Sequence, residues 1–80
     1  MPRITPVDWR TLIKVFVLHG CEYKRKQGSH HVLTCPDARR AIVIPEYDEI
    51  DAEIDAEIIK NNLRSAGISR DEYFDLLRRV

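Results

Sequence analysis

An α+β two-layer sandwich is the fold class that this sequence predicts, and three observations predict it. Apolar residues recur at helical spacing before residue 20 and again after residue 53, and between these stretches lie three short segments with strand-like patterns. A chain of 80 residues can bury only one small hydrophobic core, so we expect a single domain over residues 1–80. A helix that precedes and a helix that follows a three-stranded antiparallel sheet in the chain both need a surface to cover, which points to two layers.

The first helix is expected to begin after Asp8, a favourable N-cap, and to end at Gly20. Glycine supplies the left-handed conformation that commonly ends a helix. The apolar stripe of this helix consists of Trp9, Leu12, Ile13, Phe16 and Val17. We therefore expect an amphipathic helix of about three turns that covers the sheet.

A β-hairpin is predicted next, with strands at residues 21–26 and 29–35 and a tight turn at Gln27-Gly28. This register pairs Arg25 with His30 across the two strands. The predicted core-facing side carries Cys21, Tyr23, Val32 and Thr34, with Arg25 and His30 at its turn end, and the opposite, exposed side carries Glu22, Lys24, Lys26, Ser29, His31, Leu33 and Cys35. A slip of one residue would exchange the two faces.

The rest of the chain predicts one strand and two helices. A turn at Pro36-Asp37 precedes a β-branched third strand over residues 40–45. A direct repeat follows, Ile50-Asp51-Ala52-Glu53 and then Ile54-Asp55-Ala56-Glu57, and its second copy is expected to open a helix that runs to Ala66 and ends at Gly67. Ser69 and Glu72 have the spacing of a capping box, which predicts a short last helix. The α-β-β-β-α order is that of the double-stranded-RNA-binding fold, here with a short extra C-terminal helix.

The formal net charge of zero conceals a separation of charge along the chain. Residues 1–45 carry eight Lys and Arg against three Asp and Glu, whereas residues 46–80 carry five against ten. A basic half suggests a polyanionic or acidic partner, without specifying nucleic acid. Two of the three histidines lie together at His30 and His31 beside the predicted turn, and imidazole is the side chain best suited to proton transfer near neutral pH.

The two cysteines, Cys21 and Cys35, are too few for a disulfide framework and lack a CxxC spacing. We expect them to be reduced, buried thiols. A zinc site formed with His30 and His31 is possible by count, but no ligand spacing supports it, so no metal is predicted. The N-terminal segment has no signal-peptide core and no stretch is long enough to span a membrane, which predicts a cytoplasmic protein without a membrane partner.

Nearly the whole chain resembles the HicA (YcfA-like) toxins of bacterial toxin–antitoxin systems. The resemblance is carried by Pro6, Leu12-Ile13-Lys14, Gly20, Lys26-Gln27-Gly28-Ser29-His30-His31, Pro36-Asp37, Arg39-Arg40, Val43-Ile44-Pro45 and Leu63-Arg64-Ser65-Ala66-Gly67-Ile68-Ser69. It implies a small endoribonuclease that cleaves messenger RNA without a metal or other cofactor and that a HicB-type antitoxin holds inactive. The family's catalytic histidine follows Gly-Ser, which corresponds to His30 in this chain.

The chemistry of the residues around the predicted turn is compatible with ribonuclease activity. His30 could act as the base that takes the proton of a ribose 2′-hydroxyl. Five residues are candidates for binding RNA phosphate, namely Lys24, Arg25, Lys26, Gly28 and Ser29. The resemblance gives no such role to His31. Tyr47, in a charged loop, is expected to anchor the loop, with stacking on a base as the alternative.

The acidic segment 46–57 departs from the family. It holds seven acidic residues in twelve, and Glu46 follows Pro45 where HicA chains commonly carry a histidine or a basic residue. Acidic side chains beside His30 would weaken RNA binding. Two alternatives therefore stay open, a non-catalytic RNA-binding module and a decayed toxin that acts only as a protein-interaction domain.

Overall fold

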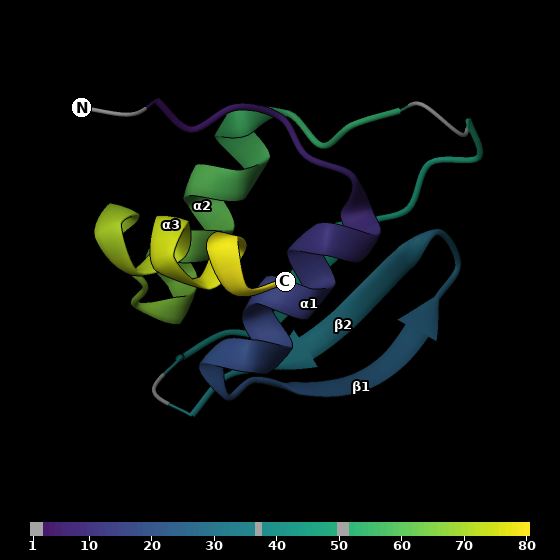
Figure 1. Cartoon of the computed structure of the whole chain (residues 1–80). Coiled ribbons are helices and arrows are strands. Elements are labelled where there is room, and N and C mark those ends of the chain that lie inside the picture. The colour runs from purple at the N-terminus through teal and green to yellow at the C-terminus, as the bar shows by residue number, and fades with distance from the viewer. Residues whose placement is uncertain (1–2, 37, 50–51) are drawn as a thin grey trace.

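The computed structural model describes residues 3–36, 38–49 and 52–80 as an α-β-β-β-α-α arrangement, in agreement with the predicted fold class. The elements are α1 (Trp9–His19), β1 (Glu22–Gln27), β2 (His30–Thr34), β3 (Ile42–Pro45), α2 (Ala56–Ala66) and α3 (Arg70–Arg79). The strands form one antiparallel sheet in the order β1-β2-β3. The helices lie on one side of the β1–β2 hairpin, whose tip extends away from them (Figure 1).

The predicted helix boundaries are confirmed because local capping determines them. The Asp8 side chain accepts a hydrogen bond from the Thr11 amide, and Gly20 ends α1 in the left-handed conformation. Asp55 caps α2, which starts within the second copy of the acidic repeat. Ser69 and Glu72 form the complete capping box of α3. In the first copy of the repeat, Ile50 and Asp51 lie outside the described residues, as does Asp37 of the predicted turn.

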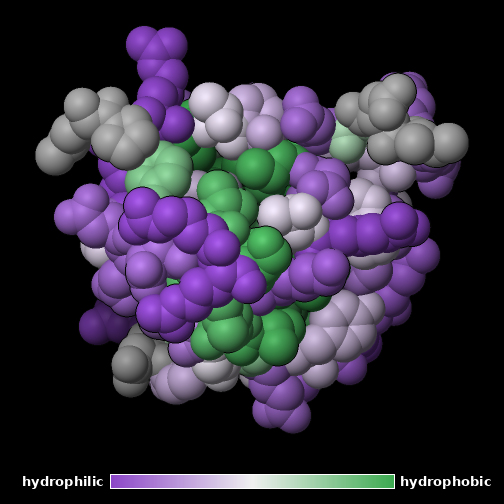
Figure 2. Space-filling model, viewed as in Figure 1, coloured by the Kyte–Doolittle hydropathy of each residue, from purple (hydrophilic) through white to green (hydrophobic). Residues whose placement is uncertain are grey.

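The core lies between the helices and one face of the sheet. It contains Leu12, Val15 and Phe16 of α1, Ile59 and Leu63 of α2, Tyr73 and Leu76 of α3, and Leu33, Ile42 and Ile44 of the sheet. An isolated bridge between Val7 and Ile54 joins the segments that precede α1 and α2. On the outer side of the helices, apolar surface is visible among hydrophilic side chains (Figure 2), and Val17, Leu18 and Val80 are the exposed apolar residues of α1 and the C-terminus. None of the helices in the described ranges has the length and apolar composition needed to cross a bilayer.

The hairpin register differs from the prediction. The turn is at Gly28-Ser29 rather than Gln27-Gly28, so that Gln27 pairs with His30. The register also shifts between Tyr23 and Arg25, where a bulge leaves Lys24 without a cross-strand partner on β2. The displaced turn moves the pairing by two residues and so leaves the faces as they were, whereas the bulge places the side chains of His31 and Leu33 on the core side of β2 and leaves His30 on the outer side. The predicted core face of β2 was therefore wrong, because one extra residue in a strand reverses the alternation on one side of it.

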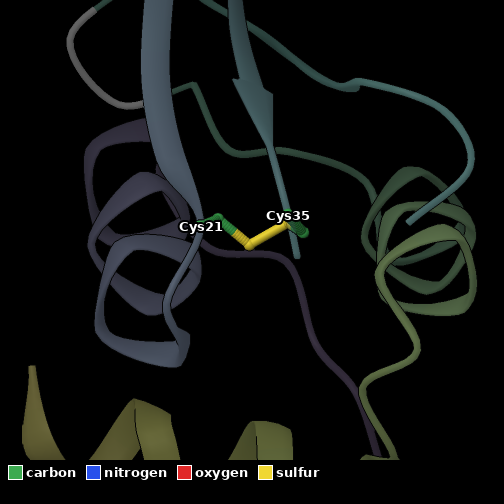
Figure 3. Close-up of a disulfide and its surroundings, with 2 residues drawn as sticks. All are labelled: Cys21 and Cys35. Carbon is green, nitrogen blue, oxygen red and sulfur yellow. A yellow bond between two sulfur atoms is a disulfide. The ribbon is translucent and has the colours of Figure 1, made fainter. Parts of the chain in front are cut away.

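The prediction of free thiols was also wrong. Cys21 and Cys35 form a disulfide across the open end of the hairpin, between the residue before β1 and the residue after β2 (Figure 3). Both are buried, as expected. Antiparallel pairing brings the two ends of a hairpin together whatever their separation in sequence, which is 14 residues here. This bond also removes both sulfur atoms from the alternative zinc site.

Candidate functional site

His30 is exposed at the start of β2, on the face of the sheet that is turned away from the helices. Its cross-strand neighbours are Gln27 on β1 and Pro45 on β3. It lines a shallow hollow together with Gln27, Val32 and Val43. The prediction that His30 lies at the edge of the core-facing side is therefore corrected, since the side chain is on the opposite, solvent-facing side of the sheet.

The turn beside His30 has an open backbone. Gly28 has a φ of 60°, in the left-handed region that favours glycine. The Ser29 carbonyl accepts a hydrogen bond of 2.7 Å from the Glu46 amide, which fixes the turn against the segment after β3. Gly28 and Ser29 are both exposed, so a phosphate group can approach this backbone closely.

The three basic residues of β1 differ in their surroundings. Lys24, in the bulge, pairs with Glu22 at 3.1 Å, and Lys26 pairs with Glu46 at 3.1 Å. Arg25 pairs in register with Val32, which places it on the same face as His30 and diagonal to it. Within the described ranges Arg25 forms no salt bridge. Of the three predicted phosphate-binding cations, Arg25 therefore combines a position on the face of His30 with the absence of a salt bridge to any described residue.

His31, predicted to lie on the exposed face, is instead buried, with 6% of its surface accessible. Its ring stacks on Trp9 at a centroid distance of 4.6 Å. Its Nδ1 lies 2.8 Å from the Tyr23 hydroxyl and its Nε2 lies 2.7 Å from Glu46 Oε1. Both ring nitrogens are thus occupied by hydrogen bonds inside the protein, which makes His31 a structural residue.

Glu46 is held as a carboxylate by two partners. The hydrogen bond from His31 is the largest cause, and the hydrogen bond from Lys26 the second, of a pKa for Glu46 below its ordinary value of 4.5. Lys26 forms a salt bridge with Glu46 and so compensates its negative charge. Glu46, the acid that departs from the family pattern, therefore forms its hydrogen bonds with other residues of the fold.

Two further acids of this segment line a different hollow from the one that contains His30. Asp48 and Glu49 line a separate hollow with Asp8, Trp9 and Arg10. In the described part of the chain, no acidic side chain lines the hollow that contains His30. Tyr47, expected in a charged loop, also lines the separate hollow.

Sequence reasoning missed the cluster of Tyr23, His31, Glu46 and Trp9, because its members come from four separate segments. The one available signal was the pair of adjacent histidines at the start of a strand. Successive strand residues point to opposite faces, so only one of the two can face solvent while the other is buried. Which one is buried depended on the register.

Residues 9–68 match the family model described as the HicA toxin of bacterial toxin–antitoxin systems. No curated protein and no solved structure matches the chain. The matched range includes α1, the whole sheet and α2, and therefore both histidines of the turn.

Proposed function

Since this chain belongs to the HicA toxin family of bacterial toxin–antitoxin systems, we propose that it is a toxin that cleaves messenger RNA as an endoribonuclease, and that a HicB-type antitoxin neutralises it. The catalytic residue in this proposal is His30. The observation that carries the proposal is the contrast between the two histidines. His31 has both ring nitrogens bonded within the fold, whereas His30 is exposed in a hollow without acidic residues in the described part of the chain.

The chemistry required of such a site is limited. His30 takes the proton of a ribose 2′-hydroxyl, the 2′-oxygen then attacks the adjacent phosphorus, and the bond to the 5′-oxygen of the next nucleotide breaks. The leaving 5′-oxygen takes up a proton, and the products are a 2′,3′-cyclic phosphate end and a 5′-hydroxyl end. The Arg25 guanidinium, diagonal to His30 on the same face, would stabilise the charge on the phosphate oxygens. No step needs a metal.

A messenger RNA substrate also implies that the protein acts in the cytoplasm. Thiols are kept reduced there, so the working form in this proposal carries Cys21 and Cys35 as thiols. The disulfide closes the end of the hairpin that is opposite to the Gly28-Ser29 turn, so we expect its reduction to leave the turn and His30 in place.

The test compares His30→Ala with His19→Ala, which removes an imidazole at the end of α1, outside the hollow that contains His30. Each chain is expressed without an antitoxin, and growth and the integrity of messenger RNA are followed. The wild type and His19→Ala are expected to arrest growth and to degrade RNA. His30→Ala is expected to lower cleavage by roughly 100-fold or more, the usual loss for a general acid or base.

Two results would contradict the proposal. One is a wild-type chain that binds RNA without cleaving it, which would favour the RNA-binding module. The other is equal cleavage by wild type and His30→Ala. Cleavage by purified protein is expected to persist in the presence of a chelator.

A further inference from the structure

A second group of basic side chains lies away from His30, at the end of α2. Arg39 and Arg40, from the segment between β2 and β3, and Arg64, from the last turn of α2, line one hollow together with Ser65 and Gly67. All three arginines are exposed. Within the described ranges no acidic side chain lines this hollow, and none of the three forms a salt bridge.

Helix capping accounts for only one of these charges. Arg64 lies where a cation interacts favourably with the negative end of the helix dipole. The carbonyls of Leu63 and Arg64 already accept hydrogen bonds from the amides of Ile68 and Gly67, respectively. Arg39 and Arg40 come from a different segment, and they add two further positive charges to the same hollow. Like charges placed together repel one another, so an anion that bridges the guanidinium groups would stabilise this arrangement.

The arginine hollow is connected to the His30 hollow through β3. Val43 lines the His30 hollow, and its carbonyl accepts a hydrogen bond of 3.1 Å from the Asn62 side chain of α2. Asn62 is two residues before Arg64 on the same helix. Arg40 of the arginine hollow and Val43 of the His30 hollow are three residues apart in the chain, so at about 3.3 Å per residue their backbones lie within roughly 10 Å of each other. A polymer with regularly spaced negative charges can occupy both at once.

We propose that Arg39, Arg40 and Arg64 form a binding site for backbone phosphates of the RNA substrate, several nucleotides from the bond that is cut. This inference rests on the proposed ribonuclease function for the identity of the polymer. Arginine binds phosphate oxygens through pairs of N–H groups, and the Ser65 hydroxyl is a further donor in the same hollow. On β1, in contrast, Lys24 and Lys26 are already paired with Glu22 and Glu46.

The test measures binding of a short single-stranded oligoribonucleotide in a His30→Ala background, so that no cleavage interferes. The variant is Arg39→Ala/Arg40→Ala/Arg64→Ala. Its matched control is Lys14→Ala/Arg78→Ala/Arg79→Ala, which removes the same number of positive charges from α1 and α3. Affinity is measured at several salt concentrations.

Each lost contact between an arginine and a single-strand phosphate lowers the slope of log affinity against log salt by about 0.7. We therefore expect the triple-arginine variant to bind more weakly at low salt and to lose about 1.4 to 2.1 from this slope, for two to three contacts. The control variant is expected to keep the parent slope. When the three arginine substitutions are made in a chain that keeps His30, cleavage is expected to show a raised KM with kcat retained.

An unchanged slope and an unchanged KM in the triple-arginine variant would overturn the inference. The inference also fails if the only effect of the three substitutions is that the variant no longer binds an antitoxin. Equal losses in the control variant would also overturn it, because they would show a dependence on net charge alone. If the triple-arginine variant loses the expected slope but the wild-type chain does not cleave RNA, the arginine site stands and the catalytic proposal fails. If neither the wild-type chain nor His30→Ala binds RNA, both fail.

Discussion

The imidazole of His31 and the carboxylate of Glu46 are joined by a hydrogen bond of 2.7 Å between Nε2 and Oε1. The bond connects the second residue of β2 to the residue that directly follows β3, and Trp9 of α1 covers the imidazole from one side. It thereby links the sheet, α1 and the start of the acidic segment. The same bond uses Glu46 inside the fold, so this acid does not face the outer side of the sheet, where we propose that RNA binds.

Substitution of His31 is expected to lower the stability of the fold much more than substitution of His30. His31→Ala removes a buried ring that stacks on Trp9 and bonds to Tyr23, so we expect it to lower the free energy of unfolding by about 2 to 3 kcal/mol. His30→Ala, on the exposed side, is expected to change it by less than about 0.5 kcal/mol. Urea unfolding of both variants measures the difference. Similar losses in the two would contradict the assigned faces of β2.

Acidification is expected to remove the contribution of Glu46. Hydrogen bonds from His31 and Lys26 lower the pKa of Glu46 in the folded chain, so folding favours the carboxylate. A lowered pKa stabilises the fold above the unfolded value of 4.5, and the contribution is lost as the pH falls through the folded value. Glu46→Gln is therefore expected to be less stable than wild type near neutral pH, with a difference that shrinks below pH 4.5.

Glu53→Gln is the control for that experiment, because Glu53 is exposed and forms no salt bridge with any described residue. Thermal unfolding at a series of pH values should give parallel curves for Glu53→Gln and wild type. A difference between Glu46→Gln and wild type that stays constant down to low pH would show that the carboxylate charge is not what stabilises the fold.

Reduction of the disulfide is expected to destabilise the protein without abolishing cleavage. The bond between Cys21 and Cys35 closes a loop of about 15 residues, for which chain-entropy arguments give a contribution of about 3 kcal/mol. Reductant should lower the Tm of wild type, and Cys21→Ala/Cys35→Ala should have a low Tm that reductant does not change. Equal Tm values for wild type with and without reductant would mean that the bond adds nothing to stability.

Tyr73→Phe is expected to leave stability unchanged or to raise it by about 1 kcal/mol. The Tyr73 hydroxyl is buried and has no hydrogen-bond partner among the described residues. Its burial also raises the pKa of this side chain. The substitution removes an unsatisfied polar atom while the ring keeps its packing. Tyr47→Phe, at an exposed position, serves as the control in the same denaturation experiment, and a clear loss of stability in Tyr73→Phe would indicate a partner for the hydroxyl.

Features with a local cause could be predicted from the sequence. The N-caps Asp8, Asp55 and Ser69 and the left-handed Gly20 and Gly67 set the helix ends through bonds within a few residues. The order of helices and strands followed from apolar periodicity, and this order gave the fold class. The candidate His30 followed from the Gly-Ser-His motif of the family resemblance, and its catalytic role stays a prediction.

Features that depend on distant residues were decided by the tertiary structure. One bulged residue, Lys24, exchanged the faces of β2, because strand side chains alternate with a period of two. The buried environment of His31 needs Trp9 and Glu46, which lie 22 residues before it and 15 after it in the chain. The sequence by itself determined where each helix and strand forms and that two histidines meet at a turn. Only the packing of α1 against the sheet decided that His31 is enclosed and His30 is left in solvent.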